Sequence, residues 1–260
     1  MIEEGDMCEC ASQKCKSIKM ELEKLKIELA DARNHNHHNT CNSCAVLDII
    51  NKCKQYINDK LLPVIESMDE VLEGNIFMVH GTLSYTNLFE SKVKNICNLA
   101  LQLGQKNNNV LEIGFNSGFS TLLFLLSNPD IKMTCVDLGD HKYTIPCYNI
   151  LKKDFGDRIS LIIGNSVQVL PSLIFANKEK YDLIHIDGGH SGYIALNDMI
   201  NSYYLSKNET IIIMDDYDFP QLHELWDLFV CDYQLKTLSN MWLCDTQYHD
   251  IKQISTKPII

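Results

Sequence analysis

The sequence predicts an α/β protein whose core is a mostly parallel β-sheet covered by helices on both faces. From residue 109 onwards, short β-rich runs alternate with helical stretches, the order typical of βαβ units. The runs are apolar almost throughout, as strands buried on both faces are. Glycines and polar residues follow each run where it ends, which is the edge at which such sheets bind ligands.

Five runs have the length and composition of buried strands; they span residues 110–113, 132–136, 159–163, 181–186 and 210–214. After Pro220 the pattern predicts a helix over 222–230 and then two further strands over 233–238 and 241–244. Ser239 and Asn240 between the last two suit a hairpin turn. We therefore expect seven strands, the last of them antiparallel.

The remainder of the chain is expected to be helical. We divide it into an N-terminal helical appendage and linker (1–44), a helical lead-in (45–104) and the sheet domain (105–260). Helical spacing of apolar residues predicts helices over 45–62 and 87–103. Pro63 breaks or restarts the first of them, and Gly74 is expected to end the helix that follows.

The appendage has a coiled-coil pattern. Between residues 11 and 32, apolar or small residues recur at alternating steps of four and three, which is the a/d seam of a coiled coil. Pairing through this seam would make the protein a homo-oligomer. An amphipathic helix packed on its own domain explains the pattern equally well.

A group of histidines and cysteines follows the seam. His35, His37 and His38 precede Cys41 and Cys44, whose Cys-x2-Cys spacing is part of a zinc site. Solvated histidines and incidental thiols are the alternative. The chain holds 11 cysteines, an odd number, and its acidic N-terminus is unlike a secretory signal. We therefore expect reduced thiols in a cytoplasmic protein.

The charge balance excludes several classes of partner. The formal net charge is -11, and Arg158 is the one arginine after residue 60. Phosphate backbones and anionic lipid surfaces are bound through clustered Lys and Arg, so we expect neither nucleic acid nor a membrane as the main partner. No apolar run reaches the roughly 18 residues that a membrane-spanning helix needs.

The motifs at the strand ends carry the chemistry. The first is a glycine turn, Glu112-Ile-Gly114-Phe-Asn116-Ser117-Gly118-Phe-Ser120. The later strands end in Asp137, Gly164-Asn165-Ser166, Asp187-Gly-Gly-His190 and Asp215-Asp216. A dinucleotide fingerprint needs G-x-G-x-x-G, and Asn116 and Phe119 occupy its second and third glycine positions, so NAD is disfavoured. Asp137 is placed to accept hydrogen bonds from a ribose diol, although an ordinary strand-end Asp is the alternative.

Residues 75–250 resemble the class I S-adenosylmethionine (SAM)-dependent methyltransferases. The stretch 110–118 is similar to their first motif, Asp137 to their ribose-binding strand end, and Asn165 with Ser166 to their adenine contact. The closest resemblance is to the metal-dependent O-methyltransferases of the catechol and antibiotic-sugar (macrocin) type. It implies a Rossmann-like fold and SAM as cofactor, bound by Glu112, Gly114, Asn116, Ser117, Gly118, Ser120, Asp137, Asn165, Ser166 and Asp187.

The acidic strand ends predict a metal site. Asp187 and Asp215 end strands expected to be neighbours, and Asp216 follows directly. Converging carboxylates raise each other's pKa unless a cation neutralises them, and an all-oxygen site suits Mg²⁺ or Mn²⁺. A vicinal diol of a sugar or catechol would be a natural further ligand. The alternative is that the three aspartates are strand-end caps and hydrogen-bond acceptors.

His190 is the predicted general base. The resemblance implies a Lys or His base three residues after Asp187, and histidine titrates near neutral pH, where a hydroxyl acceptor must lose its proton. Asp187 is the second predicted catalytic residue. The alternative for His190 is a cap of the following helix. His185 lies inside a strand and is expected to be a packed core residue.

These observations favour a SAM-dependent and Mg²⁺-dependent O-methyltransferase that acts on a small polyhydroxyl acceptor, such as a sugar or nucleotide sugar. A metal-independent methyltransferase of the same fold, acting on another nucleophile, is the first alternative. A SAM-binding scaffold that serves oligomerisation is the second, and the complete Asp187, His190, Asp215 and Asp216 set argues against it.

Overall fold

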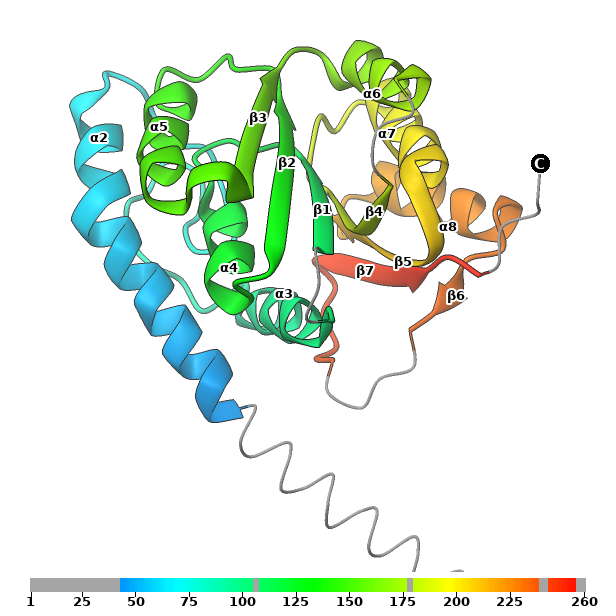
Figure 1. Cartoon of the computed structure of the whole chain (residues 1–260), viewed down its shortest axis with the longest axis horizontal. Coiled ribbons are helices and arrows are strands. Elements are labelled where there is room, and N and C mark those ends of the chain that lie inside the picture. The colour runs from blue at the N-terminus through cyan, green and yellow to red at the C-terminus, as the bar shows by residue number, and fades with distance from the viewer. Residues whose placement is uncertain (1–42, 105–107, 177–179, 239–242, 256–260) are drawn as a thin grey trace, which may run out of the picture. The chain divides into compact units, whose positions relative to one another are not determined.

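The computed structural model describes residues 43–104, 108–176, 180–238 and 243–255. Its centre is a seven-stranded sheet of order β3-β2-β1-β4-β5-β7-β6 (Figure 1). β1 to β5 run parallel, and β7 is antiparallel to both β5 and β6. The predicted fold class is confirmed: a mostly parallel, Rossmann-like sheet with an antiparallel last strand.

The five predicted parallel strands are all present; two match the predicted runs and three extend beyond them. They are β1 (Asn108–Ile113), β2 (Ile131–Asp137), β3 (Ile159–Ile163), β4 (Tyr181–Ile186) and β5 (Ser206–Asp215). Successive residues alternate between the two faces, and both faces are buried. Val110 and Leu111, for example, are each 0% exposed yet belong to different hydrophobic cores. This double burial explains why the runs read as continuously apolar.

The C-terminal strands differ from the prediction. β6 is short (Lys236–Thr237) and β7 lies at His249–Gln253, whereas residues 243–244 are not strand. The predicted turn at 239–240 and the first half of the predicted strand over 241–244 fall outside the described residues. Thr237 pairs with Lys252, so the antiparallel partner of β6 is β7, and the predicted pairing with a strand over 241–244 is wrong.

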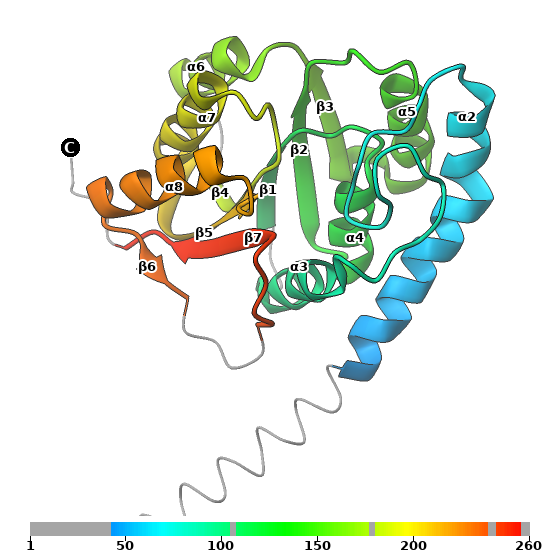
Figure 2. The ribbon, with the colours of Figure 1, turned by 180° about the vertical axis from the view of Figure 1, so that it is seen from behind.

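Six helices cover the sheet. α3 (Glu90–Gln102), α4 (Phe119–Ser127) and α5 (Thr144–Phe155) pack on one face with the larger core, and the short η2 (Gly156–Arg158) follows α5. α6 (Ser166–Phe175), α7 (Gly192–Leu205) and α8 (Pro220–Asp232) pack on the other face (Figure 2). The helical layers leave the carboxyl ends of β1, β2, β4 and β5 free for a cavity.

The helical lead-in runs in three pieces. Residues 43–56 are α-helical, η1 (Ile57–Leu61) is a π-helical turn, and α2 (Leu62–Ser67) has Pro63 in its first turn, as a restarted helix would. Gly74 does not end this helix, because Met68 is already extended. Residues 68–89 instead form a long connection to α3, which we call the strap.

The predicted coiled-coil seam and the histidine–cysteine group before Cys44 fall outside the described residues. In the described ranges, no helix is long and apolar enough to cross a membrane.

Candidate active site

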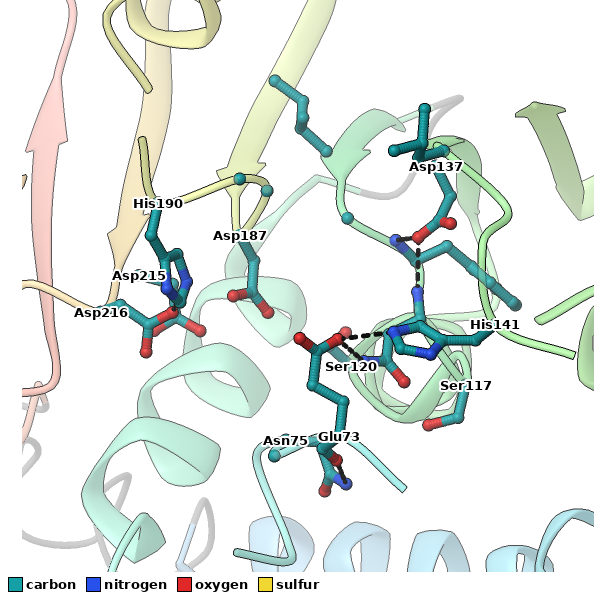
Figure 3. A pocket seen from close by; sticks show the side chains of 18 of the residues that line it. Glu73, Asn75, Ser117, Ser120, Asp137, His141, Asp187, His190, Asp215 and Asp216 are labelled. Carbon is teal, nitrogen blue, oxygen red and sulfur yellow. Dashed lines mark hydrogen bonds and ion pairs between the residues drawn. The ribbon is translucent and has the colours of Figure 1, made fainter. Parts of the chain in front are cut away.

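A cavity of about 530 Å³ lies at the carboxyl ends of the parallel strands (Figure 3). The glycine turn after β1 and the residues that follow β2, β3, β4 and β5 form its walls. The strap and the start of α3 also contribute to its lining. Every predicted site residue except Glu112 and Gly118 lines it. Its volume is within the usual range for a small-molecule site.

The glycine turn is held in a shape that only glycine permits at its first position. Gly114 has φ of 97°, and a Cβ placed there would lie 1.8 Å from the carbonyl oxygen of Asp187. The backbone of the turn is therefore in direct contact with the end of β4, where Asp187 N also donates to Ile113 O at 2.8 Å. This contact brings the glycine turn, where the cofactor is expected to bind, against Asp187, the first of the predicted acidic residues at the strand ends.

Asp137, at the end of the neighbouring strand β2, holds the glycine turn in place through hydrogen bonds. Its Oδ2 accepts hydrogen bonds from the backbone N–H groups of Phe115 and Asn116, both at 2.8 Å. Its Oδ1 accepts one from Gly139 N at 2.7 Å. The carboxylate thus fixes two loops, and each oxygen keeps accepting capacity that a hydroxyl of a ligand can use. Nearby, Ser117 Oγ is buried and has no hydrogen-bond partner among the described residues.

Glu112 lies outside the cavity. It is 0% exposed, accepts a hydrogen bond from Thr121 Oγ1, and has its Oε1 3.1 Å from His185 Nδ1. A direct contact between Glu112 and a ligand is therefore not possible in this arrangement. Its side chain instead orients His185, which is buried in the core as expected but belongs to a polar network there.

Asn165 and Ser166 lie where β3 meets α6. Asn165 caps the helix, because its Oδ1 accepts from Val167 N at 3.0 Å. Both Asn165 and Ser166 line the cavity. The two residues therefore stand at the wall that the resemblance assigns to adenine.

The strap contributes residues that no sequence motif indicated. Glu73 points into the cavity, where its Oε2 accepts from Asn116 Nδ2 at 2.7 Å and lies 3.0 Å from His141 Nε2 (Figure 3). The other ring nitrogen of His141 is 2.7 Å from Glu70 Oε1. His141 thus bridges two carboxylates of the strap and ties it to the loop after β2.

The ties between His141 and the strap depend on pH. Burial lowers the pKa of His141, but its bonds to Glu70 and Glu73 outweigh this and raise the pKa above the usual value. A raised histidine pKa contributes stability that is complete below about pH 6.5 and is lost as the pH rises through the folded-state value. The same bond lowers the pKa of Glu70. The stability that the Glu70 carboxylate contributes is therefore lost at acid pH, as the pH falls through this lowered pKa.

We expect the thermal stability that His141 provides to shrink with rising pH. The difference in melting temperature between the wild type and His141→Gln should be largest near about pH 6 and fall toward about pH 9. Differential scanning fluorimetry across this range measures it, with His80→Gln on the same strap as the matched control. A difference that is constant with pH would show that no charge on His141 is involved.

A buried lysine stands among the acidic strand ends. Asp187 and Asp215 occupy neighbouring positions of β4 and β5, because Ile186 pairs with Met214 in the parallel register. Lys92, on the first turn of α3, places its Nζ 2.5 Å from Asp215 Oδ2. The two residues are 5% and 1% exposed. Burial favours the neutral form of Asp215, but Lys92 and His185 lower its pKa below the usual range.

The three predicted metal ligands do not meet as a set. One ligand atom each from His185, Asp187 and Asp215 lies within 4.8 Å of the others, but Asp216 is absent from this group of described residues. A Mg²⁺ ion on Asp215 would lie about 2.1 Å from its oxygen and therefore close to the ammonium of Lys92, which repels it. The residues present do not fit a divalent ion held by Asp187, Asp215 and Asp216.

Asp216 pairs with His190 instead. His190 Nε2 lies 2.7 Å from Asp216 Oδ2, and the ring packs against Phe219 with the centroids 5.0 Å apart. The bond to Asp216 raises the pKa of His190 more than partial burial lowers it. The half-exposed ring stands at the cavity wall with its Nδ1 atom not taken up by Asp216 (Figure 3). A carboxylate that holds one ring nitrogen orients the other for proton transfer.

Comparison with known proteins agrees with this fold. A family model described as a methyltransferase domain matches residues 111–217. No curated protein matches the chain significantly.

Three solved structures illustrate the likeness. The O-methyltransferase from Bacillus cereus in complex with S-adenosylhomocysteine (SAH) is 13% identical, with a TM-score of 0.53 over 82% of this chain and 91% of that chain. A SAM-bound O-methyltransferase of tomaymycin synthesis from Streptomyces achromogenes is 14% identical, with a TM-score of 0.48 over 64% and 80%. A TDP-rhamnose 3'-O-methyltransferase of calicheamicin biosynthesis is 14% identical, with a TM-score of 0.49 over 64% and 78%. At these identities the likeness is one of fold, and the Bacillus structure carries it.

Proposed function

We propose that this chain, a SAM-dependent methyltransferase with the class I O-methyltransferase fold, methylates a hydroxyl group of a small polyhydroxyl acceptor such as a sugar or nucleotide sugar. The observation that carries the proposal is one cavity with two unlike walls. One wall is the glycine turn with Asp137, and the other holds the His190–Asp216 pair. A cofactor on the first wall would direct its methyl group at an acceptor on the second.

The first wall would hold SAM. The backbone of the turn at Gly114 lines the cavity where the methionine part would lie, and Ser117 and Ser120 would offer hydroxyl groups to its carboxylate. The free lone pairs of Asp137 would accept from the ribose hydroxyls, while Asn165 and Ser166 would meet adenine. Glu73 carries a negative charge at the same end of the cavity, which suits the ammonium group of the cofactor.

Removing the carboxylate of Asp137 should weaken SAM binding. We expect Asp137→Ala to cost about 1–3 kcal/mol of binding free energy, because the ribose loses a charged acceptor and the turn loses its anchor. Calorimetry with SAH and with an SAH analogue that lacks the ribose hydroxyls separates the two causes. The substitution should reduce the affinity for SAH more than for the analogue. Equal losses would mean that Asp137 only anchors the turn.

The second wall would carry out the proton transfer. The acceptor oxygen attacks the methyl carbon of the sulfonium in line with the C–S bond, which breaks, and sulfur keeps the electron pair as SAH forms. The proton of the hydroxyl passes to His190 Nδ1, because Nε2 is held by Asp216. The cavity adds positioning and exclusion of water. No step in this scheme requires the Mg²⁺ or Mn²⁺ that the sequence suggested.

The polar character of the second wall supports a polyhydroxyl acceptor. Asp187, His190 and Asp216 offer several hydrogen-bonding groups within the cavity, and a sugar has a hydroxyl group for each. Phe219 provides an apolar surface for the face of a ring. A plain apolar acceptor would displace water from these polar groups without offering them a hydrogen bond.

Mass spectrometry tests the proposal directly. The full chain would be incubated with SAM and a panel of sugars, nucleotide sugars and catechols. A product heavier by one methylene unit, together with an equal amount of SAH, is the expected result. Binding of SAM without methylation of any hydroxyl compound, but with methylation of an amine or thiol in a matched panel, would overturn the choice of acceptor.

A further inference from the structure

Lys92 is a charged residue of the cavity to which the reaction scheme gives no role. It lies on the first turn of α3, lines the cavity, and is 5% exposed. A lysine is rarely buried to this extent unless a carboxylate compensates its charge. No other lysine or arginine lines the cavity among the residues that the structure describes.

The surroundings of Lys92 keep it charged. Burial alone lowers its pKa, but Asp215, Asp187 and Asp216 raise it in that order, and the net result is a pKa above the usual value. The ammonium is therefore protonated at neutral pH. It is a fixed positive charge at the carboxyl ends of β4 and β5.

The same carboxylates would otherwise need a cation. Asp187 and Asp215 end adjacent strands, so their charges lie close together in a setting of low dielectric constant. Desolvation and the charge of Asp215 raise the pKa of Asp187, and Lys92 opposes this effect. The position of the ammonium, 2.5 Å from Asp215 Oδ2, is next to the place where a metal ion would bind this oxygen.

We infer that Lys92 is the resident cation of this site and takes the place of a divalent metal ion, so that the protein neither requires nor binds Mg²⁺ there. Its part in catalysis rests on the proposed methyl transfer, whereas its effect on ion binding does not. Lys92 acts as a positioning residue: it holds the carboxylate of Asp215 in a buried ion pair and provides a positive potential beside the acceptor hydroxyl. That potential favours the negative charge that develops on the attacking oxygen.

Manganese binding to the wild-type full chain is the first test. Mn²⁺ replaces Mg²⁺ in oxygen sites, and the electron paramagnetic resonance signal of the free ion falls when it binds. We expect no loss of signal that depends on Asp215, so wild type and Asp215→Asn should give the same trace. Stoichiometric binding that Asp215→Asn abolishes would overturn the inference, whether or not any methyl transfer is found.

Removing the ammonium should create a metal site. Lys92→Met keeps the length of the side chain but leaves Asp187, Asp215 and His185 without their cation. We expect this variant to bind Mn²⁺ at least roughly tenfold more tightly than wild type, and its melting temperature to rise when Mn²⁺ is added. Lys94→Met is the matched control, because Lys94 lies on the same helix and pairs with Glu90 at the surface. A folded Lys92→Met that gains no Mn²⁺ binding would contradict the inference.

Lys92→Arg is the second variant, for the case that Lys92→Met does not fold. The guanidinium keeps a positive charge, so this variant should remain insensitive to Mn²⁺ in thermal unfolding; a stabilisation that saturates at a one-to-one ratio would count against the inference.

Turnover completes the test. Wild-type methyl transfer should be unchanged by EDTA, and Lys92→Met should lose roughly 10²-fold in kcat and recover part of it with Mn²⁺. Loss of wild-type activity in EDTA would overturn the inference. Absence of any turnover would count against the proposed function, while the Mn²⁺ measurements would still decide on Lys92.

Discussion

Replacing His190 with alanine should lower kcat by roughly 10²–10⁴-fold, the range typical of a lost general base. The ring is the group that would receive the acceptor proton, because Asp216 holds Nε2 at 2.7 Å and leaves Nδ1 toward the cavity. SAM binding should be largely retained, since the glycine turn and Asp137 are on the other wall. The residual rate should increase with pH as more of the acceptor ionises by itself. Initial rates and SAM calorimetry measure both.

The control for this variant is another histidine–aspartate pair. His223 Nε2 lies 3.3 Å from Asp227 Oδ2, and the pair is exposed and does not line the cavity. His223→Ala should keep the wild-type rate.

The pH profile gives a second measurement on the same residue. Asp216 raises the pKa of His190, and the base acts in its neutral form, so kcat/KM should rise with pH through this raised value. Asp216→Asn removes the charge and should shift this rise to lower pH. Full activity of His190→Ala at neutral pH would assign the histidine a structural role and leave Asp187 as the proton acceptor.

Gly114→Ala is expected to be the most damaging single substitution. A Cβ at this position would lie 1.8 Å from the carbonyl oxygen of Asp187, which is a backbone atom held by the β1–β4 pairing. The backbone is also at φ of 97°, where alanine is strained. The ends of β1 and β4 would have to separate. We expect a loss of at least about 4 kcal/mol in the free energy of unfolding, and no measurable SAM binding.

A second glycine makes the control. Gly156 also has a positive φ, of 57°, but a Cβ there meets no atom within 4 Å. Gly156→Ala should therefore cost only the backbone strain, about 1–3 kcal/mol, and should bind SAM normally. Urea unfolding and calorimetry on both variants measure the difference. Similar behaviour of the two variants would mean that the turn can move away from β4.

Much of this arrangement could be predicted from the sequence because it depends on local patterns. Strands buried on both faces are apolar throughout, so the five parallel strands were visible as runs. The carboxyl ends of parallel strands meet at one edge of a sheet, so the sequence alone predicts that Asp137, Asp187 and His190 lie at one cavity, and they do.

The features of the fold and the site that the sequence does not reveal depend on contacts between distant parts of the chain. The sequence does not indicate β7 because four of its five residues are polar, as expected for a strand less fully buried than β4. Lys92 reads as an ordinary helical lysine, like Lys94 two residues later, and only the packing of α3 against β5 distinguishes them. Glu73 and His141 meet across 68 positions of sequence, with no motif around either. The sequence suggests that Asp216 is a metal ligand because it follows Asp215 directly. Adjacency does not reveal which way a side chain turns, and Asp216 turns toward His190.

The close contact between Gly114 and the carbonyl oxygen of Asp187 also bears on how this protein can be redesigned. The turn after β1 and the end of β4 form one rigid block, joined by the bond from Asp187 N to Ile113 O. A library that varies this block would mostly yield unfolded protein. The strap and residues 138–141 face the same cavity but are joined to the block mainly through side chains. Directed evolution toward a new acceptor should therefore draw its productive changes from the strap and that loop, with the strand ends kept constant.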